Sequence, residues 1–156
     1  MPPAPADPTL RPMPTIWTIG YEQATQPAVI GALQAAGVEV LADIRALPLS
    51  RRPGFSKSSL AAAAREAGIE YRHMKPLGTP AEGRAAARRH DHAALAEIYA
   101  GQLELPEAMA AMAELRTLAG ERRVALLCYE REAAECHRAL LIDALLADFA
   151  RIDLKP

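Results

Sequence analysis

The stretch that decides the fold is Val38-Glu39-Val40-Leu41-Ala42-Asp43-Ile44, which is almost entirely apolar. A second run of the same kind, Val124-Ala125-Leu126-Leu127-Cys128, occurs near the other end of the chain. Strands of this composition are typical of parallel sheets whose two faces are both covered by helices. The two runs therefore predict the centre of a parallel α/β sheet.

The rest of the chain alternates between strand and helix patterns around these two runs. Further strands are predicted at residues 15–19, 69–73 and 152–154. Helices are predicted at residues 27–36, 57–67, 91–101, 106–118 and 133–150. Residues 74–92 are predicted to be mainly loop, because Gly78, Pro80 and Gly83 interrupt them. This order predicts one α/β domain with a mostly parallel sheet and helices on both faces, in a Rossmann-like or rhodanese-like three-layer arrangement.

Length and composition bound the class of protein. The chain has 156 residues, of which 51% are hydrophobic and 24% charged, which excludes a fully disordered protein. Residues 1–14 hold six prolines and are expected to form a disordered tail, followed by a single domain at residues 15–156. We expect no signal peptide, because no basic segment followed by an apolar one occurs at the start of the chain. We expect no membrane partner, because no apolar run approaches the length of a membrane span. Two cysteines are too few for a disulfide scaffold and favour a cytoplasmic location.

The charge of the chain is unevenly distributed, although its net value is only -1. Residues 45–90 carry a net charge of +7, whereas residues 91–156 carry -5. Most of the basic residues are arginine, whose planar guanidinium suits two-pronged recognition of phosphate or carboxylate. The arginine-rich loop that follows residue 44 is therefore a candidate anion-binding segment.

Parallel strands bring distant segments of the chain together at their carboxyl ends, where ligands bind in such sheets. We therefore predict a ligand-binding site there, with Arg138 approaching from the start of the last helix. The candidate ligand-binding residues are Tyr21, Asp43, Arg45, Arg51, Arg52, Lys57, His73, Cys136, His137 and Arg138. In one interpretation Arg45, Arg51 and Arg52 converge on an anion. In the other, Asp43 pairs with a nearby arginine and no anion is needed.

The two cysteines leave several interpretations open. Cys128 ends a strand and is the candidate catalytic residue, but Glu130 and Glu132 disfavour its thiolate, and a buried inert thiol is the simpler interpretation. A redox pair of Cys128 and Cys136 is a further alternative. The spacing from Cys128 to Cys136-His137 is not a recognised zinc pattern, and consecutive helical residues point about 100° apart. We therefore predict no metal site and no cofactor.

Several short motifs occur in a characteristic order along the chain. They are Thr18-Ile19-Gly20-Tyr21, Asp43-Ile44-Arg45-Ala46-Leu47-Pro48, Tyr71-Arg72-His73, Leu127-Cys128-Tyr129-Glu130 and Cys136-His137-Arg138. Over about residues 15–146 this order resembles the bacterial and archaeal family called domain of unknown function 488. The resemblance implies the fold and the choice of site residues but no particular reaction. Tyr21 stands where the resemblance implies a histidine in many relatives.

Three function hypotheses follow. The first is binding of a phosphate-bearing small molecule or nucleic acid in an arginine-lined crevice, where Arg45, Arg51, Arg52 and Lys57 contact phosphate. The second is a sulfur-transfer or redox enzyme that uses Cys128. The third is a protein-interaction module that docks through the proline-rich tail and the basic loop. Neither the ligand nor an oligomeric state is predicted.

Overall fold

A parallel sheet of five strands organises the molecule. The computed structural model of the chain describes residues 13–156, and most of the predicted tail at residues 1–14 lies outside them. The strands are β1 (Thr15–Gly20), β2 (Val40–Asp43), β3 (Glu70–His73), β4 (Val124–Cys128) and β5 (Ala150–Leu154). They follow the order β3-β2-β4-β1-β5, and every neighbouring pair is parallel. The predicted parallel α/β sheet is confirmed.

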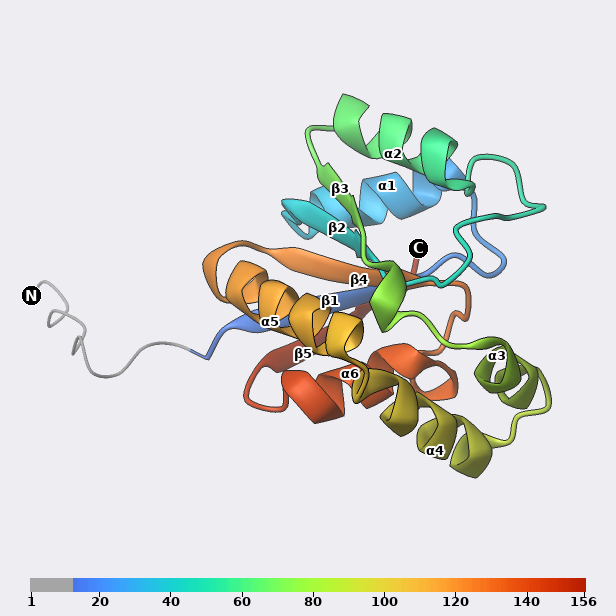
Figure 1. The fold of residues 1–156 in the computed structure, drawn as a ribbon. Coiled ribbons are helices and arrows are strands. Elements are labelled where there is room, and N and C mark those ends of the chain that lie inside the picture. The colour runs from blue at the N-terminus through green and yellow to red at the C-terminus, as the bar shows by residue number, and fades with distance from the viewer. Residues whose placement is uncertain (1–12) are drawn as a thin grey trace, which may run out of the picture.

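Helices cover both faces of this sheet (Figure 1). They are α1 (Gln26–Ala35), α2 (Lys57–Glu66), α3 (Ala81–Arg88), α4 (His92–Leu103), α5 (Pro106–Glu121) and α6 (His137–Leu145), with short 3-10 helices η1 (Lys75–Leu77) and η2 (Ala133–Glu135). Successive residues of β2 point to opposite faces. Leu41 packs in a core with α1 and α2, whereas Val40 and Ala42 pack in a second core with α4, α5 and α6. This alternation explains why the central strands are apolar throughout.

Two segments differ from the sequence prediction. The helix predicted at residues 133–150 is divided, because Cys136 has an extended backbone (φ -135°) and caps a helix that ends at Leu145. The loop predicted at residues 74–92 contains η1 and α3. Gly83 lies inside α3, where a Cβ would stand 2.2 Å from Thr79 Cγ2 and 3.3 Å from Ile98 Cγ2. This glycine therefore permits close packing and does not end a helix.

The order of the strands opens a crevice at the carboxyl end of β4. The connections that leave β1 and β2 run to the face covered by α1 and α2, whereas the connection that leaves β4 runs to the opposite face. Adjacent strands whose connections diverge in this way leave room for a ligand between them. At this point Gly20 pairs with Cys128, and a Cβ on Gly20 would lie 1.8 Å from Glu130 O. The missing side chain lets the segment after β4 cross the end of β1.

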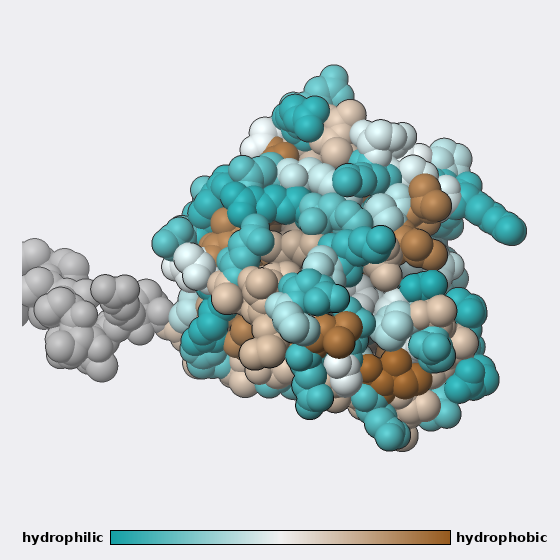
Figure 2. All heavy atoms as spheres, in the orientation of Figure 1, coloured by the Kyte–Doolittle hydropathy of each residue, from teal (hydrophilic) through white to brown (hydrophobic). Residues whose placement is uncertain are grey.

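The surface shows no large apolar band on the face drawn in Figure 2, where hydrophobic residues form small clusters between hydrophilic ones. Among residues 13–156, none of the helices combines the length and apolar character that crossing a bilayer requires.

Candidate functional site

A cavity of about 540 Å³ lies at the carboxyl ends of β1 and β4 and reaches the loop that follows β2. Its walls come from segments that are far apart in the sequence: the start of the loop after β1, residues 45–51, α3, residues 128–130 and the start of α6. Apolar residues, among them Leu47, Leu49 and Leu95, line part of it. Six of the predicted site residues also line it: Tyr21, Arg45, Arg51, Cys128, Cys136 and His137. The predicted residues Asp43, Arg52, Lys57, His73 and Arg138 lie outside the lining.

Arg45 is held in place by a buried ion pair with Asp43. Nε of Arg45 donates to Asp43 Oδ1 at 2.8 Å, and Nη2 donates to Oδ2 at 2.7 Å. The remaining nitrogen, Nη1, donates to Phe55 O at 2.6 Å and to Tyr21 Oη at 3.2 Å. The Tyr71 hydroxyl also donates to Asp43 Oδ2. We therefore assign Arg45 to the support of this edge, because each of its three side-chain nitrogens already has an acceptor.

The ionisation of this cluster follows from the same contacts. Burial lowers the pKa of Arg45, but its hydrogen bonds to Asp43 and the negative charge of Asp43 outweigh burial and raise that pKa above its usual value. Burial raises the pKa of Tyr71, and the hydrogen bond to Asp43 raises it further. Both side chains therefore keep their protons across the physiological range. His73 Nε2 lies 2.8 Å from Arg45 O. Because a carbonyl only accepts, His73 is the donor, and it holds the backbone of Arg45 in place.

The adjacent residues Arg51 and Arg52 point in different directions. Arg51 is exposed and lines the cavity. Arg52 instead donates from Nη2 to Ala24 O at 2.5 Å and ties the loop to the segment after β1. Lys57 begins α2 and is exposed outside the cavity lining. Four cations were predicted to contact phosphate: Arg45, Arg51, Arg52 and Lys57. Among residues 13–156, only Arg51 of these four lines the cavity without an ion-pair partner.

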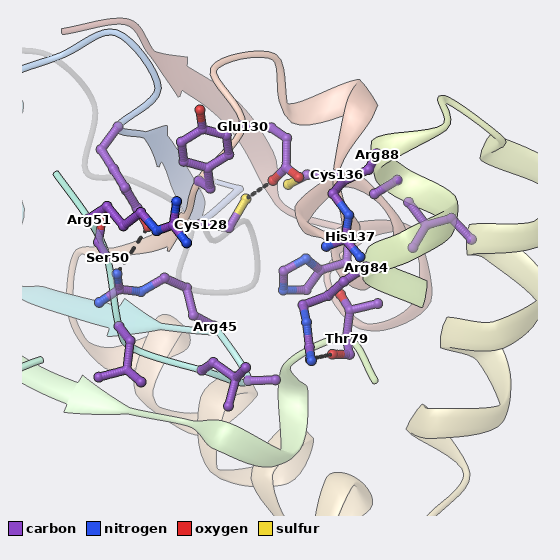
Figure 3. Close-up of a pocket in the computed structure, with 17 residues that line it drawn as sticks. Arg45, Ser50, Arg51, Thr79, Arg84, Arg88, Cys128, Glu130, Cys136 and His137 are labelled. Carbon is purple, nitrogen blue, oxygen red and sulfur yellow. Dashed lines mark hydrogen bonds between the residues drawn. The ribbon is translucent and has the colours of Figure 1, made fainter. Parts of the chain in front are cut away.

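Two further cavity arginines were not predicted as site residues. Arg84 and Arg88 lie one turn apart on α3 and both line the cavity. Arg84 Nη1 donates to Thr79 O at 2.7 Å. Figure 3 shows both arginines on the side of the cavity opposite Arg51. Their spacing of four residues places them on one face of a helix, and this signal was available once residues 81–88 were recognised as helical.

Both cysteines reach the floor of the cavity. Cys128 ends β4, and its thiol donates to Glu130 Oε2 at 3.4 Å. Cys136 caps α6, and its Sγ accepts hydrogen bonds from Arg138 N at 3.2 Å and from Arg138 Nε at 3.0 Å. Cys128 Sγ, Cys136 Sγ and a ring nitrogen of His137 all lie within 4.8 Å of one another. Since Cys136 precedes the helix, the 100° separation expected between it and His137 does not apply.

The two thiols have opposite ionisation tendencies. Burial raises the pKa of Cys128, and the neighbouring Cys136 raises it further. Burial also acts to raise the pKa of Cys136, but its contacts with Cys128 and His137 and the charge of Arg138 outweigh burial and lower that pKa. The better candidate for a thiolate is therefore Cys136, whereas the sequence pattern marked Cys128 as the candidate catalytic residue and disfavoured its thiolate.

His137 has a defined tautomer. Its Nε2 lies 2.7 Å from Ile44 O, and because a carbonyl only accepts, Nε2 carries the proton. The other ring nitrogen, Nδ1, is then available to Cys136 or to a ligand. The ring also packs edge-on against Tyr99, with centroids 5.2 Å apart. The neighbouring Arg138 is completely buried and donates to Glu130 O.

These features define a class: an all-parallel α/β domain with an arginine-lined cavity and two thiols at the carboxyl end of its central strand. A family model described as "Domain of unknown function DUF488" matches residues 25–145, and the chain belongs to this family. Searches of curated proteins and of solved structures found no match. This match confirms the resemblance that the sequence motifs indicated. The family description states no ligand or reaction, so both must be inferred from the geometry of the site.

Proposed function

We propose that the cavity binds a phosphate-bearing ligand of nucleotide size. The observation that carries this proposal is the set of three guanidinium groups, from Arg51, Arg84 and Arg88, on the walls of one cavity. Within residues 13–156, no carboxylate lies within ion-pair distance of any of these three arginines. Like charges grouped in this way repel one another unless an anion compensates them. A phosphate group would accept two-pronged hydrogen bonds from them.

The rest of the lining favours a ligand that has an apolar part as well as a charged one. Leu47 and Leu49 are exposed at the cavity, and so is the ring of Tyr129. Tyr21 stacks on Phe55 with ring centroids 4.4 Å apart, which holds its ring at the cavity wall. A volume of about 540 Å³ is within the range of small-molecule sites. A nucleotide combines a flat ring with phosphate and suits this lining better than inorganic phosphate does.

The test is calorimetric titration of AMP, pyrophosphate and inorganic phosphate into the wild type and into Arg51→Ala, Arg84→Ala and Arg88→Ala. Each arginine that donates to phosphate contributes about 1.5–3 kcal/mol, so each variant should weaken binding about tenfold or more. Binding should also weaken steeply as the salt concentration rises.

The matched control is Arg89→Ala. Arg89 follows α3 directly, lies outside the cavity lining and has an ion-pair contact with Asp91 at 3.8 Å. This variant should bind like the wild type. The proposal is overturned if the wild type binds none of the three probes, or if the three cavity variants bind as tightly as Arg89→Ala.

A second candidate, sulfur-transfer or redox chemistry, is favoured by the presence of both thiols in the same cavity lining. In that case Cys136, to which Arg138 donates two hydrogen bonds, is the better candidate nucleophile than Cys128. The measurement that separates this candidate is the redox state of the two thiols, which the experiment below records. The interaction-module hypothesis depends mainly on a tail that lies outside the described residues.

A further inference from the structure

We propose that Cys128, Cys136 and His137 form a zinc-binding site at the floor of the cavity. The two Sγ atoms and a His137 ring nitrogen lie within 4.8 Å of one another. Zinc in a tetrahedral site holds such atoms at about 3.5–3.8 Å from one another, given Zn–S distances of about 2.3 Å and Zn–N distances of about 2.0–2.1 Å. The separations therefore need to close by about 1.3 Å at most, which a change of side-chain torsion can supply.

The hydrogen bond of His137 matches that of a metal-binding histidine. Nε2 donates to Ile44 O at 2.7 Å, which fixes the orientation of the ring and keeps Nδ1 free of that contact. Histidines that bind a metal through one nitrogen commonly donate from the other to a backbone carbonyl or a carboxylate. The partner here is a backbone atom at the end of β2, so the sheet itself positions the ring.

The surroundings of Cys136 suit a thiolate ligand. Arg138 donates to its Sγ from both N and Nε, and Arg138 is completely buried. A buried cation needs a nearby negative charge. Of the two acceptors that the Arg138 side chain contacts, Cys136 Sγ and Glu130 O, only the sulfur can become an anion. Hydrogen bonds from N–H groups to a bound sulfur also orient the ligand without occupying the metal.

The three residues supply three ligands of a tetrahedral site and leave a fourth position. All three line the same cavity, so the fourth position faces the space that the arginines surround (Figure 3). Two cysteines, one histidine and an exchangeable fourth ligand are typical of a catalytic zinc site, whereas structural zinc sites have four protein ligands. We infer that the ion would contact water or a ligand in the cavity.

The spacing of these residues in the sequence does not predict a metal site, because it matches no recognised zinc pattern. Seven residues lie between Cys128 and Cys136, and this segment passes over the end of β1 at Gly20 and returns to the start of α6. The ligands are thus brought together by the fold and not by a short local motif.

The experiment is a titration of the reduced protein, cleared of metal with a chelator, with Co²⁺ followed by Zn²⁺. The chain has only two cysteines, so any thiolate-to-cobalt charge-transfer band must come from Cys128 and Cys136. We expect this band to saturate at one equivalent of Co²⁺ and to disappear when Zn²⁺ displaces the cobalt. Added Zn²⁺ should also raise the thermal midpoint of the wild type.

Variants assign the ligands. Cys136→Ser and His137→Gln should weaken Co²⁺ binding at least about tenfold. His92→Gln, a variant of an exposed histidine at the start of α4, should bind Co²⁺ like the wild type. Circular dichroism checks that each variant is folded, and the wild-type spectrum decides the question by itself if a variant is not.

The inference is overturned if the reduced, folded wild type gives no thiolate-to-cobalt band, or if Cys136→Ser keeps the wild-type spectrum. Conversion of the two thiols to a disulfide, with no cobalt uptake after reduction, would overturn it in favour of a redox pair. The inference does not depend on the proposed phosphate site. Arg51→Ala should weaken phosphate binding about tenfold or more and keep the cobalt band, so the two proposals fail independently.

Discussion

The edge of the sheet that carries the cavity has two unlike halves. In the half around Asp43 and Arg45, charges are buried and matched: a carboxylate meets a guanidinium, and two tyrosine hydroxyls complete the contacts. In the half formed by Arg51, Arg84 and Arg88, charges are grouped without carboxylate partners among the described residues. An arginine at a strand end therefore serves the fold when an acidic partner is buried beside it. The arginines that lack such a partner are the candidates for binding.

The largest effect is expected in the matched half. Asp43→Asn leaves the buried guanidinium of Arg45 without a counter-charge and should lower the free energy of unfolding by about 3–5 kcal/mol. Arg51 belongs to the half without carboxylate partners, called here the open half. Arg51→Gln should change the free energy of unfolding by no more than about 0.5 kcal/mol, because the side chain is exposed. Urea denaturation at pH 7 measures both.

A double variant sharpens this prediction. Asp43→Asn combined with Arg45→Met removes both charges, so it should recover part of the stability that Asp43→Asn loses. If Arg51→Gln proved as costly as Asp43→Asn, the distinction between the two halves would not hold.

The second largest effect is expected at Gly20, which pairs with Cys128 beneath the cavity. Gly20→Ala places a Cβ 1.8 Å from Glu130 O and 2.6 Å from its carbonyl carbon, so the backbone after β4 must move. We expect a loss of about 1–3 kcal/mol or more in the free energy of unfolding, together with weaker phosphate binding.

Gly101→Ala provides the matched control for that substitution. Gly101 lies within α4, and a Cβ there meets no atom within 4 Å. Alanine should stabilise this helix by up to about 1 kcal/mol. An equal response of the two glycine positions in urea denaturation would show that the crossing at Gly20 is not a constraint.

The fold was largely predictable, because its strands are marked by apolar runs and most helices by ordinary start and stop signals. Gly83 misled the prediction at α3, since a glycine that permits close packing has the same appearance in a sequence as one that ends a helix. The break at Cys136 was missed because the residues on both sides are good helix formers. Whether a segment continues as helix there is decided by tertiary contacts.

The location of the site was predictable from the strand ends, but the roles of its residues were not. Arg51 and Arg52 are adjacent and chemically identical, and only the position of Ala24 O, 28 residues away in the sequence, separates their roles. Likewise, the convergence of Cys128 on Cys136 and His137 depends on how residues 129–135 fold back. Such contacts between distant segments are not encoded in local patterns.

The smallest effect is expected at an exposed ion pair, which can be compared with the buried pair of Asp43 and Arg45. Arg151 and Asp153 repeat the contacts of Asp43 and Arg45. The two residues again lie two positions apart in the sequence, with Arg151 Nε 2.9 Å from Asp153 Oδ1 and Nη2 3.0 Å from Oδ2. Their side chains are 31% and 34% exposed, whereas those of Arg45 and Asp43 are 6% and 0% exposed. The same contact in water should contribute much less, so Asp153→Asn should cost only about 0.5 kcal/mol at pH 7.

The pH dependence of that small loss gives its origin. Burial acts to raise the pKa of Asp153, but hydrogen bonds from Arg151 and Thr18 outweigh it and lower the pKa in the folded protein. A group of this kind stabilises the fold above its unfolded pKa of about 3.9, and the contribution disappears as the pH falls through the lower folded value. The wild type should therefore have a higher urea midpoint than Asp153→Asn throughout the range from pH 5 to pH 7. The two midpoints should converge at more acidic pH. A difference that persisted under strongly acidic conditions would mean that Asp153 acts through packing or its bond with Thr18, and that burial alone does not distinguish the two pairs.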